Sequence, residues 1–195
     1  MKNTIVTRYE EYPDPASYHR FPNFTDLIRT FFLKLRYNIT IGNFSKICKN
    51  VEIVITKGGK LQIGHHTTIS DYTFIQLTKP SPYIIIGDHT VIGRNCFIAS
   101  KTKLTIGNYV LIGAYCQIID NSHSIDRNNL IINQKANYSP VRIMDDVWLG
   151  TGVKVLKGVT IGNGAVIGAN SVVTKNIPNY EIWAGNPAKY INKRK

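Results

Sequence analysis

The feature of this sequence that most constrains its fold is a large aliphatic residue that recurs at every sixth position. In the last third of the chain the series has no break. Its members are Ile143, Leu149, Val155, Ile161, Ile167 and Val173. Small or β-branched residues stand two positions before these members, and glycine follows several of them. A helix would place apolar residues three and four positions apart, so the six-residue period predicts a short strand followed by a turn.

The same period appears upstream in blocks of three hexads, and its phase is lost only between blocks. The blocks are Ile41, Ile47 and Ile53, then Ile63, Ile69 and Ile75, then Ile86, Ile92 and Ile98, and then Ile106, Ile112 and Ile118. Because the extra residues always follow the third hexad, they fall at one corner, and three hexads form one triangular coil. Six such coils, stacked at the spacing of neighbouring strands, predict a prism roughly 30 Å long with an aliphatic interior.

This pattern resembles the left-handed parallel β-helix of the hexapeptide-repeat acyltransferases, over about residues 41–191. The left hand is implied by the resemblance alone, because ordinary crossover chirality would favour the right hand. We therefore expect an all-β domain of about six coils over 41–178. A loop over 119–142 interrupts it, and a basic tail over 179–195 follows it.

Residues 1–40 lack the repeat and form a separate N-terminal segment. Thr25 and Asp26 offer a helix start, and the apolar residues that follow recur at three- and four-residue intervals. These residues are Leu27, Ile28, Phe31, Phe32 and Leu35. They predict a helix over about 25–37 that caps the open end of the prism, where strand edges would otherwise meet water. A basic amphipathic helix lying on a membrane surface is the alternative.

The composition points to an anionic small-molecule partner in the cytoplasm. Lys and Arg number 24 against 12 Asp and Glu, giving a net charge of +12. No nucleic-acid-binding motif accompanies these bases, so we expect no nucleic-acid partner. No apolar stretch is long enough for a transmembrane segment, and the N-terminus lacks a signal-peptide pattern. The three cysteines are too few for a disulfide framework and form no metal-binding pattern.

The loop over 119–142 is the expected place for the chemistry, because a loop of that length in a compact repeat protein is usually functional or disordered. In the acyltransferases that the sequence resembles, such a loop carries the catalytic histidine, here His123. A histidine suits the removal of a proton from an acceptor hydroxyl that attacks a thioester. Asp120 and Asp126 are both candidates for orienting the imidazole, and the sequence does not choose between them. Where many relatives have a first histidine, this chain has Asn121.

The end of the chain carries the residues that the resemblance assigns to acetyl-CoA. The pantetheine would follow the coil edge at small residues, its nucleotide end would meet basic residues, and Trp148 would form a wall beside the thioester. The expected contacts are Trp148, Gly150, Thr151, Gly168, Ala169, Thr174, Lys175 and Lys189. Cations are physically expected beside phosphate groups. For Trp148, packing on a neighbouring subunit is a compatible alternative.

The sequence therefore predicts an acetyl-CoA-dependent acetyltransferase that modifies a sugar hydroxyl, with no metal. The acceptor would be a free sugar, a nucleotide sugar or a polysaccharide precursor, and the resemblance implies a homotrimer. N-acetylation of an amino-sugar nucleotide is one alternative, and a non-catalytic β-helix scaffold is another, since the fold itself implies no chemistry. His65, His66 and His89 lie in short turns and are expected to be structural, because their spacing does not match that of the zinc enzymes sharing this fold.

Overall fold

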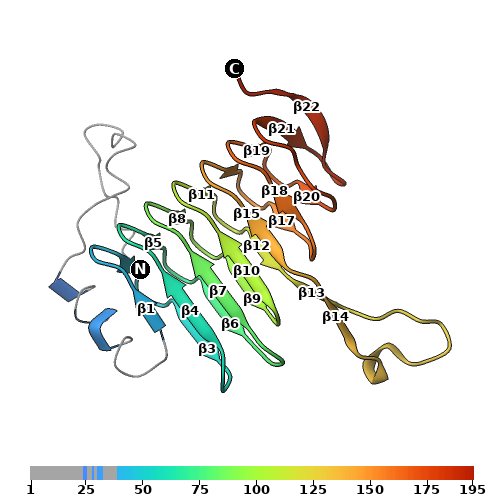
Figure 1. The fold of residues 1–195 in the computed structure, drawn as a ribbon, viewed down its shortest axis with the longest axis horizontal. Coiled ribbons are helices and arrows are strands. Elements are labelled where there is room, and N and C mark those ends of the chain that lie inside the picture. The colour runs from blue at the N-terminus through green and yellow to red at the C-terminus, as the bar shows by residue number, and fades with distance from the viewer. Residues whose placement is uncertain (1–23, 26–27, 29, 33–38) are drawn as a thin grey trace, which may run out of the picture.

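The computed structural model describes residues 24–25, 28, 30–32 and 39–195. Its main body is a parallel β solenoid of six coils, and each coil contributes one strand to each of three sheets (Figure 1). Sheet A contains β1 (Ile39–Ile41), β4 (Lys60–Ile63), β7 (Tyr83–Ile86), β10 (Lys103–Ile106), β15 (Val141–Ile143) and β18 (Thr160–Ile161). Sheet B contains β2 (Lys46–Ile47), β5 (Thr68–Ile69), β8 (Val91–Ile92), β11 (Leu111–Ile112), β16 (Trp148–Leu149), β19 (Val166–Ile167), β21 (Glu181–Ala184) and β22 (Lys189–Lys193). Sheet C contains β3 (Glu52–Ile55), β6 (Phe74–Leu77), β9 (Phe97–Ser100), β12 (Gln117–Ile119), β17 (Lys154–Val155) and β20 (Val172–Val173).

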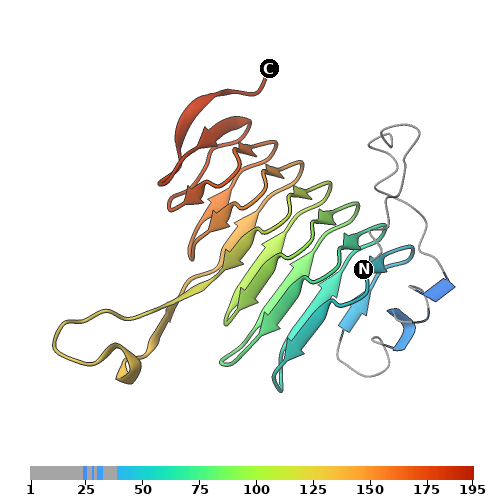
Figure 2. The ribbon, with the colours of Figure 1, turned by 180° about the vertical axis from the view of Figure 1, so that it is seen from behind.

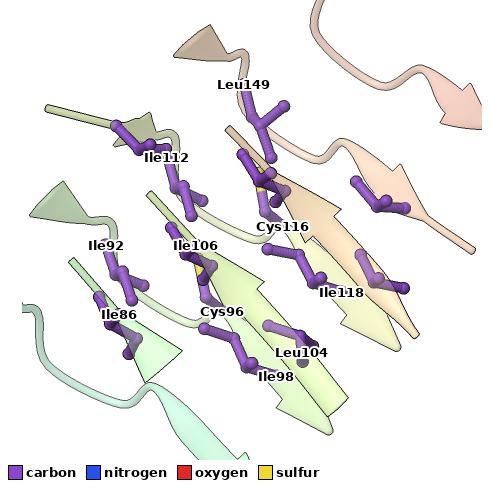
Figure 3. Close-up of a cluster of buried hydrophobic side chains, with 14 of the residues drawn as sticks. Ile86, Ile92, Cys96, Ile98, Leu104, Ile106, Ile112, Cys116, Ile118 and Leu149 are labelled. Carbon is purple, nitrogen blue, oxygen red and sulfur yellow. The ribbon is translucent and has the colours of Figure 1, made fainter. Parts of the chain in front are cut away.

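The hexad residues fill the interior, as the six-residue period predicts. Corresponding members pair in register between coils, for example Ile106 with Ile143, and Ile112 with Leu149. Figure 3 shows the side chains from three sheets meeting in the middle of the coil, and nearly all of them are fully buried. Cys96 and Cys116 lie among them on neighbouring coils as free thiols. The hydrogen bond with Cys116, together with burial, raises the pKa of the Cys96 thiol, so Cys96 stays protonated.

Three corners join the sheets, named here the A–B, B–C and C–A corners in chain order. At the A–B corner an unusual row of rings forms, in which Phe44, His66, His89 and Tyr109 all have positive φ. Their rings stack in sequence with centroids 4.9 to 5.0 Å apart. His66 and His89 therefore help to hold successive coils together through ring stacking, and the sequence analysis also expected these histidines to be structural.

A ladder of side-chain hydrogen bonds runs along the same A–B corner. On each coil an acceptor atom caps the backbone N–H of the equivalent residue one coil earlier. The pairs are Asn43 with His65 Nδ1, His65 with Asp88 Oδ1, Asp88 with Asn108 Oδ1, Asn108 with Asp145 Oδ1, Asp145 with Asn163 Oδ1, and Asn163 with Asn179 Oδ1. Their lengths of 2.7 to 3.1 Å mark good hydrogen bonds. The turn N–H groups at this corner are therefore satisfied within the chain.

The predicted insertions all fall at the C–A corner. The longest leaves the solenoid after β12 as an arm formed by β13 (Asn121–His123) and β14 (Ala136–Tyr138), which pair antiparallel. A short 3-10 helix, η2 (Ile131–Asn133), lies near its tip. Figures 1 and 2 show the arm projecting away from the solenoid, on the side remote from β5, β8 and β11.

The C-terminal residues close one end of the solenoid. β21 joins sheet B beside β19, and β22 then folds back antiparallel to β21. The Trp183 ring is almost buried, and Lys175 Nζ lies 5.0 Å from its centroid. Arg194 donates a hydrogen bond of 2.7 Å from its guanidinium to Asp146, so part of the basic tail is fixed to the A–B corner.

The predicted N-terminal helix that covers the open end is not supported. Most of the stretch 25–37 lies outside the described residues. The described ones include Ile28, Phe31 and Phe32, which are helical but have 42%, 59% and 62% of their surface exposed. A cap would bury these side chains against the first coil. Among the described residues no helix is long and apolar enough to cross a bilayer.

Candidate functional site: a groove along sheet B and its corner

A groove of about 680 Å³ follows the outer face of sheet B and the adjoining B–C corner. Outward-facing residues of successive strands form its floor, including Leu111 and the half-exposed Trp148. Trp148 lies toward the C-terminal end of this groove, and Arg94 lines it on an earlier coil. The floor is apolar on the later coils, at Val91, Leu111 and Trp148, and polar on the first two, at Lys46 and Thr68. Apolar surface with a few polar groups is typical of sites for small organic ligands.

Backbone N–H groups are open at the B–C corner, whereas the equivalent groups are capped at the A–B corner. Ala114, Thr151 and Ala169 follow the hexad residues of sheet B by two positions, as Asn108 and Asp145 follow those of sheet A. Across the part of the chain that the structure describes, their N–H groups donate no hydrogen bond. Thr151 stands one coil above Ala114 and Ala169 stands one coil above Thr151. Alanine has no acceptor in its side chain, and the Thr151 hydroxyl does not bond to the N–H below it. Donors without a partner at the edge of a groove suit a ligand with carbonyl oxygens.

Glycines beneath these N–H groups keep the coils close together. A Cβ on Gly113 would lie 2.6 Å from the Thr151 nitrogen, and a Cβ on Gly150 would lie 2.6 Å from the Ala169 nitrogen. Both separations are too short for packed atoms, so these positions exclude a side chain. The sequence analysis assigned Gly150 to ligand contact. In the structure a glycine is needed at this position because the next coil stacks directly on it.

The structure brings part of the predicted acetyl-CoA set together along this edge. Gly150 and Thr151 follow Trp148 on one coil. The Asn170 N–H donates to the Thr151 carbonyl at 2.8 Å, so Ala169 lies directly above Thr151 on the next coil. Gly168 packs against Ala184, since a Cβ there would lie 2.8 Å from the Ala184 Cβ.

The basic members of the set lie at two different corners. Lys189 pairs with Ala184 at the B–C end of sheet B, on the groove side. Thr174 and Lys175 follow β20 and lie at the C–A corner, the corner that carries the arm. Lys175 also packs over Trp183, so its role in closing the solenoid does not require a ligand. A single chain therefore does not gather all the predicted phosphate contacts at one place.

His123 lies at the end of β13, exposed on the arm and paired in register with Ala136. Its imidazole has no hydrogen-bond partner among the described residues. Neither carboxylate considered for orienting it contacts it: Asp126 Oδ1 accepts the Asn128 N–H at 2.7 Å, in a local turn.

Asp120 is completely buried and fastens the root of the arm. Its carboxylate accepts hydrogen bonds from Ser100 Oγ at 2.7 Å and from the N–H groups of Lys101 and Thr102 at 2.8 and 2.9 Å. These bonds satisfy both oxygens with the turn of the preceding coil. Asp120 therefore fixes where the arm begins, and it influences His123 only through that position.

Within one chain the arm and the groove lie on opposite sides. The arm leaves at the C–A corner, which in a triangular coil faces away from sheet B, and Figure 2 shows this separation from behind. His123 of one chain therefore does not reach the groove beside Trp148 of the same chain. A site that uses both features needs a second copy of the chain.

Two sets of residues were missed by the sequence analysis. The A–B ladder could have been found from the Asn, Asp or His two positions after each sheet A hexad residue, because such side chains cap turns. The second set is a lysine in the turn after each sheet C strand except β12.

Among the described residues no group of three or more His, Cys, Asp and Glu is arranged to hold a metal ion.

The fold and the groove together define a parallel β-helix built from hexapeptide coils with a ligand edge and a projecting arm. The family model "Bacterial transferase hexapeptide (six repeats)" matches residues 140–175, so the chain contains the repeat of that family. A probable acetyltransferase of Mycobacterium tuberculosis is 40% identical over 148 residues, covering 75% of this chain and 49% of that protein. The chain spans about half the length of the first curated relatives that it matches.

Two solved structures have the same fold. A maltose O-acetyltransferase from Clostridium difficile is 26% identical with a TM-score of 0.59, covering 89% of this chain and 78% of that one. AntD, an N-acyltransferase from Bacillus cereus in complex with dTDP and 3-hydroxybutyryl-CoA, has a TM-score of 0.75 at 18% identity, covering 86% and 88%. The likeness to AntD concerns the fold alone.

Proposed function

We propose that this protein is an acetyltransferase that moves an acetyl group from acetyl-CoA to a hydroxyl group of a carbohydrate. The observation that carries the proposal is the set of open N–H groups of Ala114, Thr151 and Ala169 at the B–C corner, which borders the groove that Ala114 and Trp148 line. The equivalent N–H groups at the A–B corner are capped. Pantetheine contains amide carbonyls that accept such hydrogen bonds, and the family repeat matches this part of the chain. The maltose O-acetyltransferase with the same fold supports a sugar acceptor.

In this proposal acetyl-CoA supplies an activated acyl thioester, and the residues of the chain bind and orient the reactants. The N–H groups of Ala114, Thr151 and Ala169 are the candidate donors along the acyl-pantetheine part. One of them is also suited to stabilise the thioester oxygen as that atom gains negative charge. Trp148 limits the access of water from one side.

We assign the general base to His123, whose imidazole removes the proton from the acceptor hydroxyl. The exposed arm and the opposite placement of the groove support a site shared between copies, so we also propose a trimer in which the arm of one chain reaches the groove of the next. We also propose that the coils are left-handed, as the resemblance implies. The tautomer of His123 would be fixed by a group of that neighbouring chain or of the acceptor.

The test is His123→Ala, measured as acceptor-dependent release of free CoA with sugars, aminosugar nucleotides and oligosaccharides. We expect kcat to fall at least about 100-fold, the usual scale for a positioned general base. The fold should persist, because the side chain is exposed and the pairing with Ala136 involves backbone. Ser122→Ala on the same strand is the matched control and should keep near wild-type activity. Unchanged turnover in His123→Ala would remove His123 from the mechanism.

The same variant tests the shared site. Chains with His123→Ala and chains with Thr151→Trp should each be inactive alone, whereas refolded mixtures should recover part of the activity. A fully active monomer by light scattering would contradict the shared site.

A further inference from the structure

The corner of the solenoid that carries the arm is basic. The turn after sheet C contains a lysine on five of the six coils, and on the fourth coil the arm replaces the turn. These residues are Lys57, Lys79, Lys101, Lys157 and Lys175. The five turns that hold these lysines contain no Asp or Glu. The arm carries two carboxylates: Asp120 is buried and hydrogen-bonded, and exposed Asp126 accepts the Asn128 N–H in a local turn.

The other two corners carry acidic residues, and at the B–C corner Lys49 and Arg94 accompany the single carboxylate, with Arg94 3.8 Å from it. Asp88, Asp145 and Asp146 lie at the A–B corner, and Asp71 lies at the B–C corner. At the A–B corner their side chains cap turns or bind Arg194. Within the described part of the chain these lysines have no carboxylate partner: Lys57 and Lys79 are exposed, and Lys101 Nζ donates to Thr78 Oγ1 at 3.3 Å. A row of cations without neighbouring carboxylates indicates an anionic partner.

The row is regular because the coils are regular. Successive coils lie about 4.8 Å apart, so Lys57, Lys79 and Lys101 follow a straight edge about 10 Å long. Lysine binds carboxylate or phosphate as a flexible point charge, which suits a repeating anion better than one fixed group. This part of the edge therefore fits a linear chain with regularly spaced negative charges.

The edge lies beside the proposed base. Asp120 joins the root of the arm to the Lys101 turn through two backbone N–H groups. His123 follows Asp120 by only three residues, a reach of at most about 10 Å. An acceptor that presents its hydroxyl to His123 must therefore pass close to Lys101.

We propose that the acceptor is an anionic oligosaccharide or polysaccharide, bearing uronate or phosphate groups, and that Lys57, Lys79 and Lys101 hold it beside His123. This inference rests on the proposed function and narrows its substrate class. The three lysines are positioning residues, because they bind the charges of the glycan and touch no reacting atom. The later members, Lys157 and Lys175, lie beyond the arm on the side of the predicted acetyl-CoA residues.

The experiment compares one glycan in two chemical forms. A uronate-containing oligosaccharide and its carboxyl-reduced counterpart differ in charge but share their linkages. We expect the wild type to bind the acidic form about tenfold more tightly by calorimetry, with a lower KM and a similar kcat. Added salt should reduce this preference, because Lys57 and Lys79 are exposed and Lys101 is only half-buried.

The variant is the triple substitution Lys57→Gln, Lys79→Gln and Lys101→Gln, which removes the three charges and keeps polar side chains. Each exposed charge contributes roughly a 1.5- to 5-fold change, so the triple variant should lose about tenfold in affinity for the acidic form. The affinity for the reduced form and for acetyl-CoA should not change. The control carries the same loss of charge elsewhere, with Lys49→Gln, Lys193→Gln and Lys195→Gln, and should bind like the wild type.

Three outcomes overturn the proposal. The first is equal affinity of the wild type for the two forms, and the second is equal loss in the triple variant and the control. The third is lysine-dependent binding to phosphatidylglycerol vesicles without any preference for the acidic glycan, which would assign the edge to a membrane surface. If the acidic glycan binds through the three lysines but no acetyl transfer occurs to any acceptor, the proposed function fails and the assignment of the edge stands.

Discussion

The contrast between the two corners leads to a substitution that should stabilise the fold and weaken acetyl-CoA binding together. At the A–B corner, Asp145 Oδ1 caps the Asn108 N–H at 2.8 Å. Ala169 stands above Thr151 in the same register, since the Asn170 N–H bonds to Thr151 just as the Asp146 N–H bonds to Asn108. Asparagine at position 169 therefore supplies the missing acceptor above the Thr151 N–H.

The magnitude follows from one hydrogen bond. A bond of this kind contributes about 0.5 to 1.5 kcal/mol, so Ala169→Asn should raise the free energy of unfolding by about 1 kcal/mol. The bond also occupies a donor that we assign to acetyl-CoA, and the loss of one ligand hydrogen bond of similar strength raises the dissociation constant about fivefold. Urea denaturation and isothermal titration with acetyl-CoA measure the two quantities. The assay uses protein concentrations at which any oligomer stays assembled.

Two controls separate the hydrogen bond from bulk. Ala169→Val adds a side chain without an acceptor and should weaken binding without stabilising the fold. Asn108→Ala removes an existing rung at the A–B corner and should destabilise by about 1 to 3 kcal/mol, because the Asp88 N–H loses its acceptor, while acetyl-CoA binding stays unchanged. A stabilised Ala169→Asn protein that binds acetyl-CoA as the wild type does would refute the assignment of the Thr151 N–H.

Two further substitutions test the edge. Gly150→Ala should destabilise by about 1 to 3 kcal/mol and raise the KM for acetyl-CoA, because the new Cβ lies 2.6 Å from the Ala169 nitrogen. The control is Gly42→Ala at the A–B corner, whose Cβ lies 2.6 Å from the His65 nitrogen and which should cost similar stability without changing that KM. Equal KM values in the two variants would contradict the ligand role. Lys189→Ala should raise the KM for acetyl-CoA about threefold at low salt and leave kcat unchanged, because the phosphates of CoA are remote from the thioester. A KM equal to that of the wild type at two ionic strengths would remove Lys189 from the site.

The solenoid could be predicted from the sequence because a six-residue period is local and repeats many times. The corner of the insertions followed from the loss of phase after every third hexad, and the buried row of isoleucines followed from the same count. The hand of the coil did not follow, because both hands bury the same residues. The covering N-terminal helix was a prediction from one amphipathic stretch, and the exposure of Phe31 and Phe32 shows that periodicity alone does not tell what an apolar face packs against.

The site was harder to predict because its contacts join residues on different coils. Asp120 was a candidate partner of His123 because it is three residues away, yet its bonds go to Ser100, Lys101 and Thr102, about one coil earlier. Such partners depend on the register of the coils, which the sequence gives only once the length of each coil is known. The open N–H groups are likewise defined by what stands above them, and a single hexad does not contain that information.

One backbone position therefore has opposite uses at two corners of the same coil. At the A–B corner Asn, Asp or His stands two residues after the hexad residue and caps the N–H below, so this corner contributes only to stability. Where Ala or Thr stands at the equivalent position of the B–C corner, the N–H stays open, the small side chain leaves room, and Trp148 lies beside it. Thr151 and Ala169 are exposed, so water can bind their N–H groups until a ligand replaces it. The choice between a capping and a non-capping residue at this one position in the hexad thus separates the edge that holds the fold together from the edge that is available to a ligand.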